Sequence, residues 1–149
     1  FKKMNFWHIA STCFYLGKIP IAPGTMASLA TLLIWSLIPL NYFNQIIILI
    51  ILFTMGIISS KIVAKEMNEK DPSEIVIDEV VGMGISLFML PNEIILYLFA
   101  FIIFRILDIL KPSFIYSIQK LPNGWGIMLD DVVAGIFTWL ICQGINSIL

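Results

Sequence analysis

The stretch IIILIILFTMGIISS, residues 46–60, decides the fold, because it carries no charged side chain and is almost continuously apolar. The rest of the 149-residue chain has the same character, with 59% hydrophobic residues, 13% charged residues and a mean hydropathy of +0.95. Soluble domains contain roughly 45–50% apolar and about 25% charged residues. A soluble core of this size could not cover so much apolar surface, so the composition predicts an all-α integral membrane protein.

Four further apolar segments lie on either side of this stretch, at residues 26–40, 75–90, 94–110 and 127–148. Each can cross ~30 Å of hydrocarbon if it tilts or is buried against its neighbours. We therefore predict a single domain, residues 1–149, that forms a compact bundle of about five membrane helices. Residues 1–25 are expected to form an N-terminal interfacial or re-entrant segment, with His8, which has no adjacent acid or Ser motif, as an interfacial residue. Cys13 and Cys142 are expected to be free.

The basic residues predict the orientation of this bundle. All nine Lys and Arg residues fall within residues 1–25, 61–74 and 105–131, whereas the intervening loops 41–45 and 91–93 contain none. If each segment crosses once, these three regions share one side, and the positive-inside rule makes that side cytoplasmic. The net charge of −1 argues against nucleic acid as a partner.

Acidic residues gather on the same side, at the ends of three apolar segments: Asp78, Glu79, Asp108, Asp130 and Asp131. Carboxylates at that depth are costly unless they are paired, hydrated or bound to a cation. The pairs at 78–79 and 130–131 open their predicted helices, where the dipole favours acids. Asp108 is able to pair with Arg105 or Lys111, each three residues away. These alternatives explain each acid separately, but they leave open why three helices bring acids to one depth.

A divalent-cation site accounts for the whole set. Carboxylate oxygens suit Mg²⁺, which binds one or two protein carboxylates together with phosphate oxygens and waters. Phosphoryl chemistry needs such an ion to neutralise charge and to position water. An acid cluster of this kind also occurs in cation transport, so a small cation transporter or channel subunit remains the alternative.

The stretch GKIPIAPGTMASLA, residues 17–30, predicts an anion site near the start of the first apolar helix. Gly24 permits close approach of a ligand to the backbone, and Thr25 is a natural N-cap. Free amides and a positive dipole at such a helix start attract anions. Lys18, Arg105 and Lys111 supply cations suited to phosphate. The alternative is an ordinary capped turn.

Motifs for covalent phosphoryl transfer are missing from the sequence. The chain has no Asp-x-Asp-x-Thr, no Cys-x-x-x-x-x-Arg and only one histidine. It also lacks the Asp-Gly-x-x-Ala-Arg pattern of the CDP-alcohol phosphotransferases. Water activated by a metal ion is therefore the expected nucleophile.

Four segments together resemble the phosphatidylglycerophosphatase A family: IPIAPGTMASL (19–29), DPSEIVIDEVVGM (71–83), FRILDILKP (104–112) and GWGIMLDDVVAGI (124–136). The resemblance implies a Mg²⁺-dependent lipid phosphatase of the bacterial inner membrane whose active site faces the cytoplasm. Such an enzyme converts phosphatidylglycerophosphate, its phospholipid substrate, to phosphatidylglycerol and inorganic phosphate.

The resemblance also implies roles for particular residues. The five acids would be catalytic residues and metal ligands. Thr25, Ser28, Arg105 and Lys111 would bind the substrate phosphate, with Gly24 and Lys18 added from the sequence pattern described above.

Overall fold

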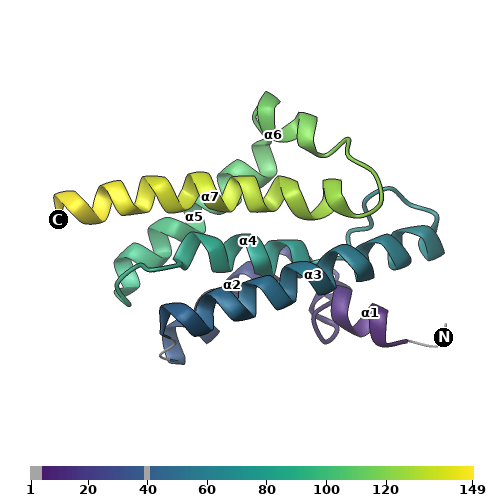
Figure 1. Ribbon diagram of the computed structural model, residues 1–149, viewed down its shortest axis with the longest axis horizontal. Helices are drawn as coiled ribbons and strands as arrows, with labels where there is room; N and C mark the ends of the chain where they lie inside the picture. Colours follow the sequence, from purple (N-terminus) through teal and green to yellow (C-terminus); the bar gives the residue numbers. More distant parts are fainter. Residues whose placement is uncertain (1–4, 39–40) are drawn as a thin grey trace.

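The computed structural model describes residues 5–38 and 41–149, which are entirely helical in their regular structure (Figure 1). The predicted all-α class is thus confirmed for this part of the chain. In order, the helices are α1 (Phe6–Ser11), the short 3₁₀ helix η1 (Leu16–Lys18), α2 (Pro23–Leu37), α3 (Tyr42–Met67), α4 (Ile77–Leu87), α5 (Ile94–Leu110), α6 (Ser113–Ile118) and α7 (Trp125–Ile148).

Helix α4 is the core helix of the bundle. Eight of its 11 residues are buried, and it packs against α2, α3, α5 and α7. Eleven residues at 1.5 Å each give a helix of about 16 Å, roughly half of the hydrocarbon thickness. The predicted crossing at residues 75–90 is therefore not confirmed as a membrane-spanning helix. Its apolar character serves the packing of the other helices around it.

Two helices, α3 and α7, are long and apolar enough to cross a membrane, and α2 is a shorter apolar helix. Helix α3 extends well beyond the predicted segment 46–60. It begins after Asn41, whose side chain accepts a hydrogen bond from the Asn44 amide at 2.8 Å. It continues through residues 61–67 because Lys, Ala, Glu and Met are good helix formers. It ends at Met67, and the C-cap residue Asn68 has a left-handed conformation with a φ of 54°.

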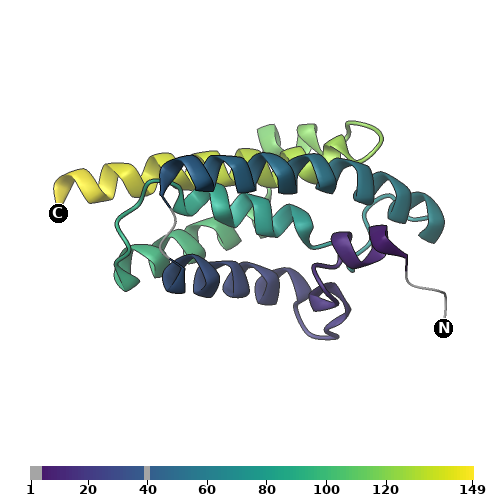
Figure 2. The same ribbon diagram turned by 60° about the horizontal axis from the view of Figure 1, so that its bottom comes forward.

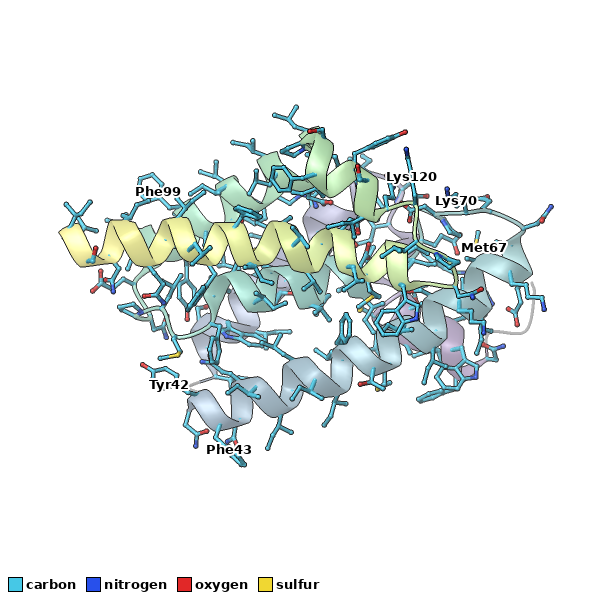
Figure 3. All side chains as sticks on the ribbon, turned by 45° about the horizontal axis from the view of Figure 1, so that its top comes forward. Tyr42, Phe43, Met67, Lys70, Phe99 and Lys120 are labelled. Atoms are coloured by element: carbon cyan, nitrogen blue, oxygen red, sulfur yellow. The ribbon has the colours of Figure 1, made fainter. Side chains whose placement is uncertain are left out.

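The helices alternate in direction, so that α2, α4 and α7 begin at the end of the bundle where α3 and α5 finish (Figure 2). Met67, Lys70 and Lys120 lie toward this end, whereas Tyr42, Phe43 and Phe99 lie toward the other (Figure 3). The arrangement gathers the charged segments at one end. Lys2 and Lys3 lie outside the described residues, as does the predicted end of the first segment at residues 39–40.

The N-terminal segment is docked on the bundle. Helix α1 packs against α3, and the Val76 amide donates a hydrogen bond to the Ser11 carbonyl at 2.9 Å. His8 is buried, with its Nε2 atom 2.5 Å from Glu66 Oε2. No acid is adjacent to His8 in the sequence, and its acidic partner lies 58 residues further along the chain. Cys13 and Cys142 are both free, as expected.

Candidate active site

The site begins with a close approach between α4 and α7, which run in the same direction (Figures 1 and 2). A Cβ atom on Gly135 would lie 2.5 Å from the Gly82 carbonyl oxygen, so only glycine fits there. Small residues of this kind let two helix backbones come together. Asp78 precedes Gly82 by four residues, and Asp131 precedes Gly135 by four. Both acids therefore lie one turn before the crossing, on the faces that meet.

All five predicted acids converge at this point. Carboxylate oxygens of Asp78, Asp130 and Asp131 lie within 4.8 Å of one another, and so do those of Glu79, Asp108 and Asp131. The two groups share Asp131 of α7, which lies close to acids of both α4 and α5. The structure thus brings acids from three helices into one cluster.

The start of α7 differs from the prediction in a way that matters for this cluster. The helix begins at Trp125 rather than near Ile127, so Asp130 and Asp131 lie in its second turn and do not open it. The stabilisation of acids by the helix dipole falls off within the first turn. Helix capping therefore does not explain this pair. Asp78 and Glu79 do lie in the first turn of α4, where the dipole favours them.

Two cations contact the acids. Arg105 donates a hydrogen bond from Nη1 to Asp108 Oδ2, one turn along α5. Lys111 Nζ lies 2.5 Å from Asp130 Oδ2 and 3.8 Å from Asp108 Oδ1. Both pairings predicted for Asp108 therefore occur, and Lys111 also links α5 to α7. Two cations face five carboxylates, so the cluster keeps an excess of acidic groups.

Several oxygens in the cluster lack a hydrogen-bond partner. Within residues 5–38 and 41–149, Asp78 Oδ1, Glu79 Oε2 and Asp131 Oδ2 are buried and form no hydrogen bond. Buried polar atoms without partners are costly, and each calls for an explanation. All three are hard oxygen donors from groups that approach one another within metal-binding distance. The donor set therefore fits a divalent cation.

A cavity of about 400 Å³ opens beside the acids. Asp78, Glu79, Arg105, Asp108 and Lys111 line it, together with the start of α2 and residues 71–73. The cavity therefore combines carboxylates, two cations and a helix N-terminus.

The first turn of α2 lies directly on the acid cluster. A Cβ atom on Gly24 would lie 2.6 Å from Glu79 Oε1 and 3.4 Å from Arg105 Nη1. The helix begins at Pro23, with Ala22 as the N-cap and no capping side chain. The prediction of Thr25 as N-cap was wrong, because proline favours the first helical position, and the helix starts at Pro23, three residues earlier than predicted. The Gly24 and Thr25 amides thus precede the first intrahelical bond, from Met26 to Ala22.

Two residues predicted to bind phosphate lie apart from the cavity. Ser28 is buried, and its hydroxyl donates to the Gly24 carbonyl at 2.9 Å. Lys18 is exposed in η1 and is absent from the cavity lining. Asp71, which the sequence analysis did not single out, does line the cavity. Its place at the start of the segment DPSEIVIDEV is the signal that could have identified it.

The cysteine nearest the site is not set up as a nucleophile. Burial, with a further contribution from Glu79, raises the pKa of the Cys13 thiol to about 12. The thiolate is the reactive form of cysteine, so this thiol is inert at neutral pH.

Comparison with known proteins places the chain among lipid phosphatases. Residues 9–146 match the profile of the family described as phosphatidylglycerophosphatase A. The chain is 39% identical over 142 residues to the phosphatidylglycerophosphatase A of Escherichia coli (strain K12), covering 92% of this chain and 81% of the relative. It is 36% identical over 149 residues to the Haemophilus influenzae protein of the same name, with coverages of 96% and 90%.

A third relative carries a different substrate in its name. The chain is 34% identical over 141 residues to a Bacteroides thetaiotaomicron protein with the provisional name phosphatidylinositol-3-phosphatase, covering 89% of each. No solved structure matches. The family profile and the identities over nearly the whole length confirm the predicted resemblance, and the chain belongs to the phosphatidylglycerophosphatase A family.

Proposed function

We propose that this protein hydrolyses the phosphomonoester of phosphatidylglycerophosphate, with Mg²⁺, to phosphatidylglycerol and inorganic phosphate. The observation that carries the proposal is the convergence of five carboxylates from three helices beside a cavity that also holds two cations. The family and the names of two relatives support the substrate. They do not favour the alternative of a cation transporter.

The acids have the role of metal ligands in this proposal: Asp78, Glu79, Asp108, Asp130 and Asp131. A bound Mg²⁺ supplies charge neutralisation at the phosphate and lowers the pKa of a coordinated water. Because Asp131 belongs to both groups of acids, it is the ligand on which the site depends most.

Arg105 and Lys111 hold the phosphoryl oxygens. Guanidinium and ammonium groups form charge-assisted hydrogen bonds with phosphate, and these strengthen as charge develops on the leaving oxygen. The Gly24 and Thr25 amides at the start of α2, which lies next to Arg105, add two neutral donors to the same cavity. Lys18 and Ser28 stay as predictions of phosphate binding that the cavity lining does not support.

Proton transfer falls to one of the unpartnered acids. Water attacks phosphorus while the bond from phosphorus to the glycerol oxygen breaks, and that oxygen takes up a proton from the solvent. Asp131 or Glu79 accepts the proton of the attacking water, since each has one buried oxygen without a protein partner among the described residues.

We place the protein in the bacterial inner membrane, with five crossings and the active site at the cytoplasmic face. The outward faces of the long helices support this placement. Ile50 and Ile51 of α3 and Leu140 of α7 are each more than half exposed, beside many other exposed apolar side chains. Apolar surface of this extent is more than soluble monomers leave uncovered. The substrate phosphate would lie at headgroup depth, where the acids and cations gather.

The test is phosphate release from phosphatidylglycerophosphate in phosphatidylcholine vesicles by the purified protein, with Mg²⁺ and with chelator. We expect release only with the metal, and slower release from phosphatidylinositol 3-phosphate. Glu93→Gln removes an exposed acid at the opposite end of the bundle and serves as the matched control, with unchanged activity. Release that persists in chelator, or a preference for the inositol lipid, would contradict the proposal.

A further inference from the structure

A second and larger cavity lies at the same end of the bundle. Its volume is about 910 Å³, and it lies between the end of α3, the loop that follows α3, and the segment from α6 to the start of α7. Four lysines line it: Lys61, Lys65, Lys70 and Lys120. Figure 3 shows Lys70 and Lys120 near each other, although they come from segments far apart in the sequence.

These lysines have no acidic partner. None of the four forms an ion pair within the residues that the structure describes. The acids in the lining are Glu69 and Asp71, and Asp71 accepts a hydrogen bond from Gln119 at 3.2 Å. Lys120 Nζ lies 5.6 Å from the centre of the Tyr116 ring. Four lysines face two acids in the lining, so the cavity keeps a net positive charge.

The positive-inside rule explains why lysines lie on this side, but not why they surround a cavity. Among the described cations, Arg105 and Lys111 line the catalytic cavity, the four lysines line the second cavity, and Lys18 lines neither. Asp71 lines both cavities, so the two are neighbours.

An apolar groove continues from the basic cavity. Ile57, Ile58, Ile62 and Trp125 line it, and it shares Lys61 and Asn123 with the cavity. Its volume is about 400 Å³, and Trp125 is 46% exposed.

In this groove the turn before α7 lies in close contact with α3. Gly124 has a φ of +85°, and a Cβ atom there would lie 2.6 Å from the Ile57 carbonyl oxygen and 3.1 Å from the Lys61 amide. Only glycine permits both the conformation and the contact. The turn before α7 is thus packed directly on α3, at the point where the cavity meets the groove.

We propose that the basic cavity binds the phosphate of an anionic phospholipid whose acyl chain lies in the adjoining groove. Lysine is a flexible point charge that suits a phosphate diester, and four lysines line a cavity that shares Lys61 with the apolar groove. A free phosphate ion would not need that channel. The binding site uses none of the proposed catalytic groups, so it stands independently of the proposed function.

The test uses the fluorescence of Trp125 in protein reconstituted into phosphatidylcholine nanodiscs. Brominated acyl chains quench a tryptophan they touch, and the difference between the parent and Trp125→Phe isolates the Trp125 component. Each lysine near an anionic lipid contributes about a fivefold preference for that lipid over a zwitterionic one. Brominated phosphatidylglycerol should therefore quench the Trp125 component as strongly as brominated phosphatidylcholine does, but at no more than about one fifth of the mole fraction.

Lysine variants then link that preference to the cavity. The triple variant Lys61→Gln, Lys65→Gln, Lys120→Gln should lose the preference, whereas Lys18→Gln, an exposed lysine outside both cavities, should keep it. Thermal unfolding confirms that each variant is folded. Equal quenching by both lipids, or a preference that survives the triple substitution, would overturn the proposal. Displacement of the lipid by millimolar inorganic phosphate at constant ionic strength would also overturn it, because the cavity would then be a site for free phosphate.

Discussion

Asp131 is the central acid of the cluster. It belongs to both groups of converging carboxylates, and its Oδ2 atom is buried without a partner in the described structure. Neighbouring carboxylates raise the cost of ionising one another, and burial adds to that cost. A cation that binds only the folded site offsets this repulsion and stabilises the protein by mass action.

We therefore predict opposite effects of Asp131→Asn on activity and on metal-free stability. Activity should fall by at least about a hundredfold, the range expected when a ligand or a general base is lost. The metal-free protein should be as stable as the parent or more so, because a buried charge has gone. The rise in melting temperature with Mg²⁺ should shrink. Thermal unfolding in detergent, with chelator and with saturating Mg²⁺, measures the stability effects, and phosphate release measures the activity.

The matched control for this variant is Glu93→Gln, which should keep the full Mg²⁺-induced shift. An equal shift in the parent and in Asp131→Asn would refute the carboxylate metal site. The same holds if the parent shows no shift at all.

Arg105 poses a different question, since its contact with Asp108 is compatible with a purely structural role. Its Nε atom is buried and without a partner among the described residues, so the guanidinium retains a free donor at the cavity wall. Lysine keeps the charge but loses the planar fork that binds two oxygens together. We expect Arg105→Lys to lower kcat/KM by at least about tenfold, equivalent to about 1.4 kcal/mol. Unchanged kinetics in a normally folded variant would mean that Arg105 only pairs with Asp108.

At the scale of elements, the contact between α4 and α7 sets the geometry of the site. Both helices carry an aspartate four residues before a glycine, at 78–82 and at 131–135. The glycines allow the backbones to touch, and the aspartates one turn earlier are thereby brought together. The precision of the site depends on this crossing, which holds acids of two helices in register.

Gly135→Ala tests the crossing. The added methyl group would lie 2.5 Å from the Gly82 carbonyl oxygen and 3.2 Å from the Gly82 Cα and carbonyl carbon, all backbone atoms that cannot rotate away. Overpacking of this kind costs about 1–3 kcal/mol, more than the roughly 1 kcal/mol that alanine gains in helix propensity. We expect a lower melting temperature and weaker Mg²⁺ stabilisation.

Gly144→Ala is the control on the same helix, because a Cβ atom there meets nothing within 4 Å. It should be neutral or slightly stabilising, by up to about 1 kcal/mol. If both substitutions behave alike, the close approach does not position the acids.

The sequence predicted much of the site because charged side chains are rare in so apolar a chain. The five acids and the two cations stand out in an apolar chain, and the structure brings all seven together. The contact between His8 and Glu66 was not predicted, because the two residues are 58 positions apart and no local sequence pattern indicates it. Thr25 was misjudged because a proline two residues earlier fixed the helix start. Local rules identify the residues, whereas contacts between distant segments decide their partners.

Helix lengths were predicted less well than residue identities. Hydropathy alone cannot distinguish a helix buried by protein from one surrounded by lipid, since both are apolar. Residues 75–90 are apolar because α4 is the core of the bundle, with eight of its 11 residues buried.

The basic cavity was not predicted from the sequence. Its four lysines come from segments that only the fold brings together.

For the whole molecule, the alternation of helix direction is the feature that brings the acids into one cluster. Acids on α4, α5 and α7 meet because the starts of α4 and α7 lie where α5 finishes (Figure 2). The same arrangement places the loop between α4 and α5 at the other end, where the Asn92 side chain donates to the Ser36 carbonyl of α2 at 2.9 Å. The bundle thus has one charged end and one end without Lys or Arg among the described residues.

This polarity leads to a prediction about the membrane. Single cysteines at Glu69 and Ser117, which are exposed at the charged end, should react only with reagents that reach the cytoplasm. A cysteine at Glu93, exposed at the opposite end, should react with an impermeant maleimide from outside. The background is Cys13→Ser, Cys142→Ala, and retained activity shows that each variant is folded. This pattern of labelling is expected because loops rich in Lys and Arg stay on the cytoplasmic side of the membrane. Labelling of residues 69 and 117 from opposite faces of the membrane would contradict the proposed orientation of α3 and α5. The acids could then not form one site at one membrane surface.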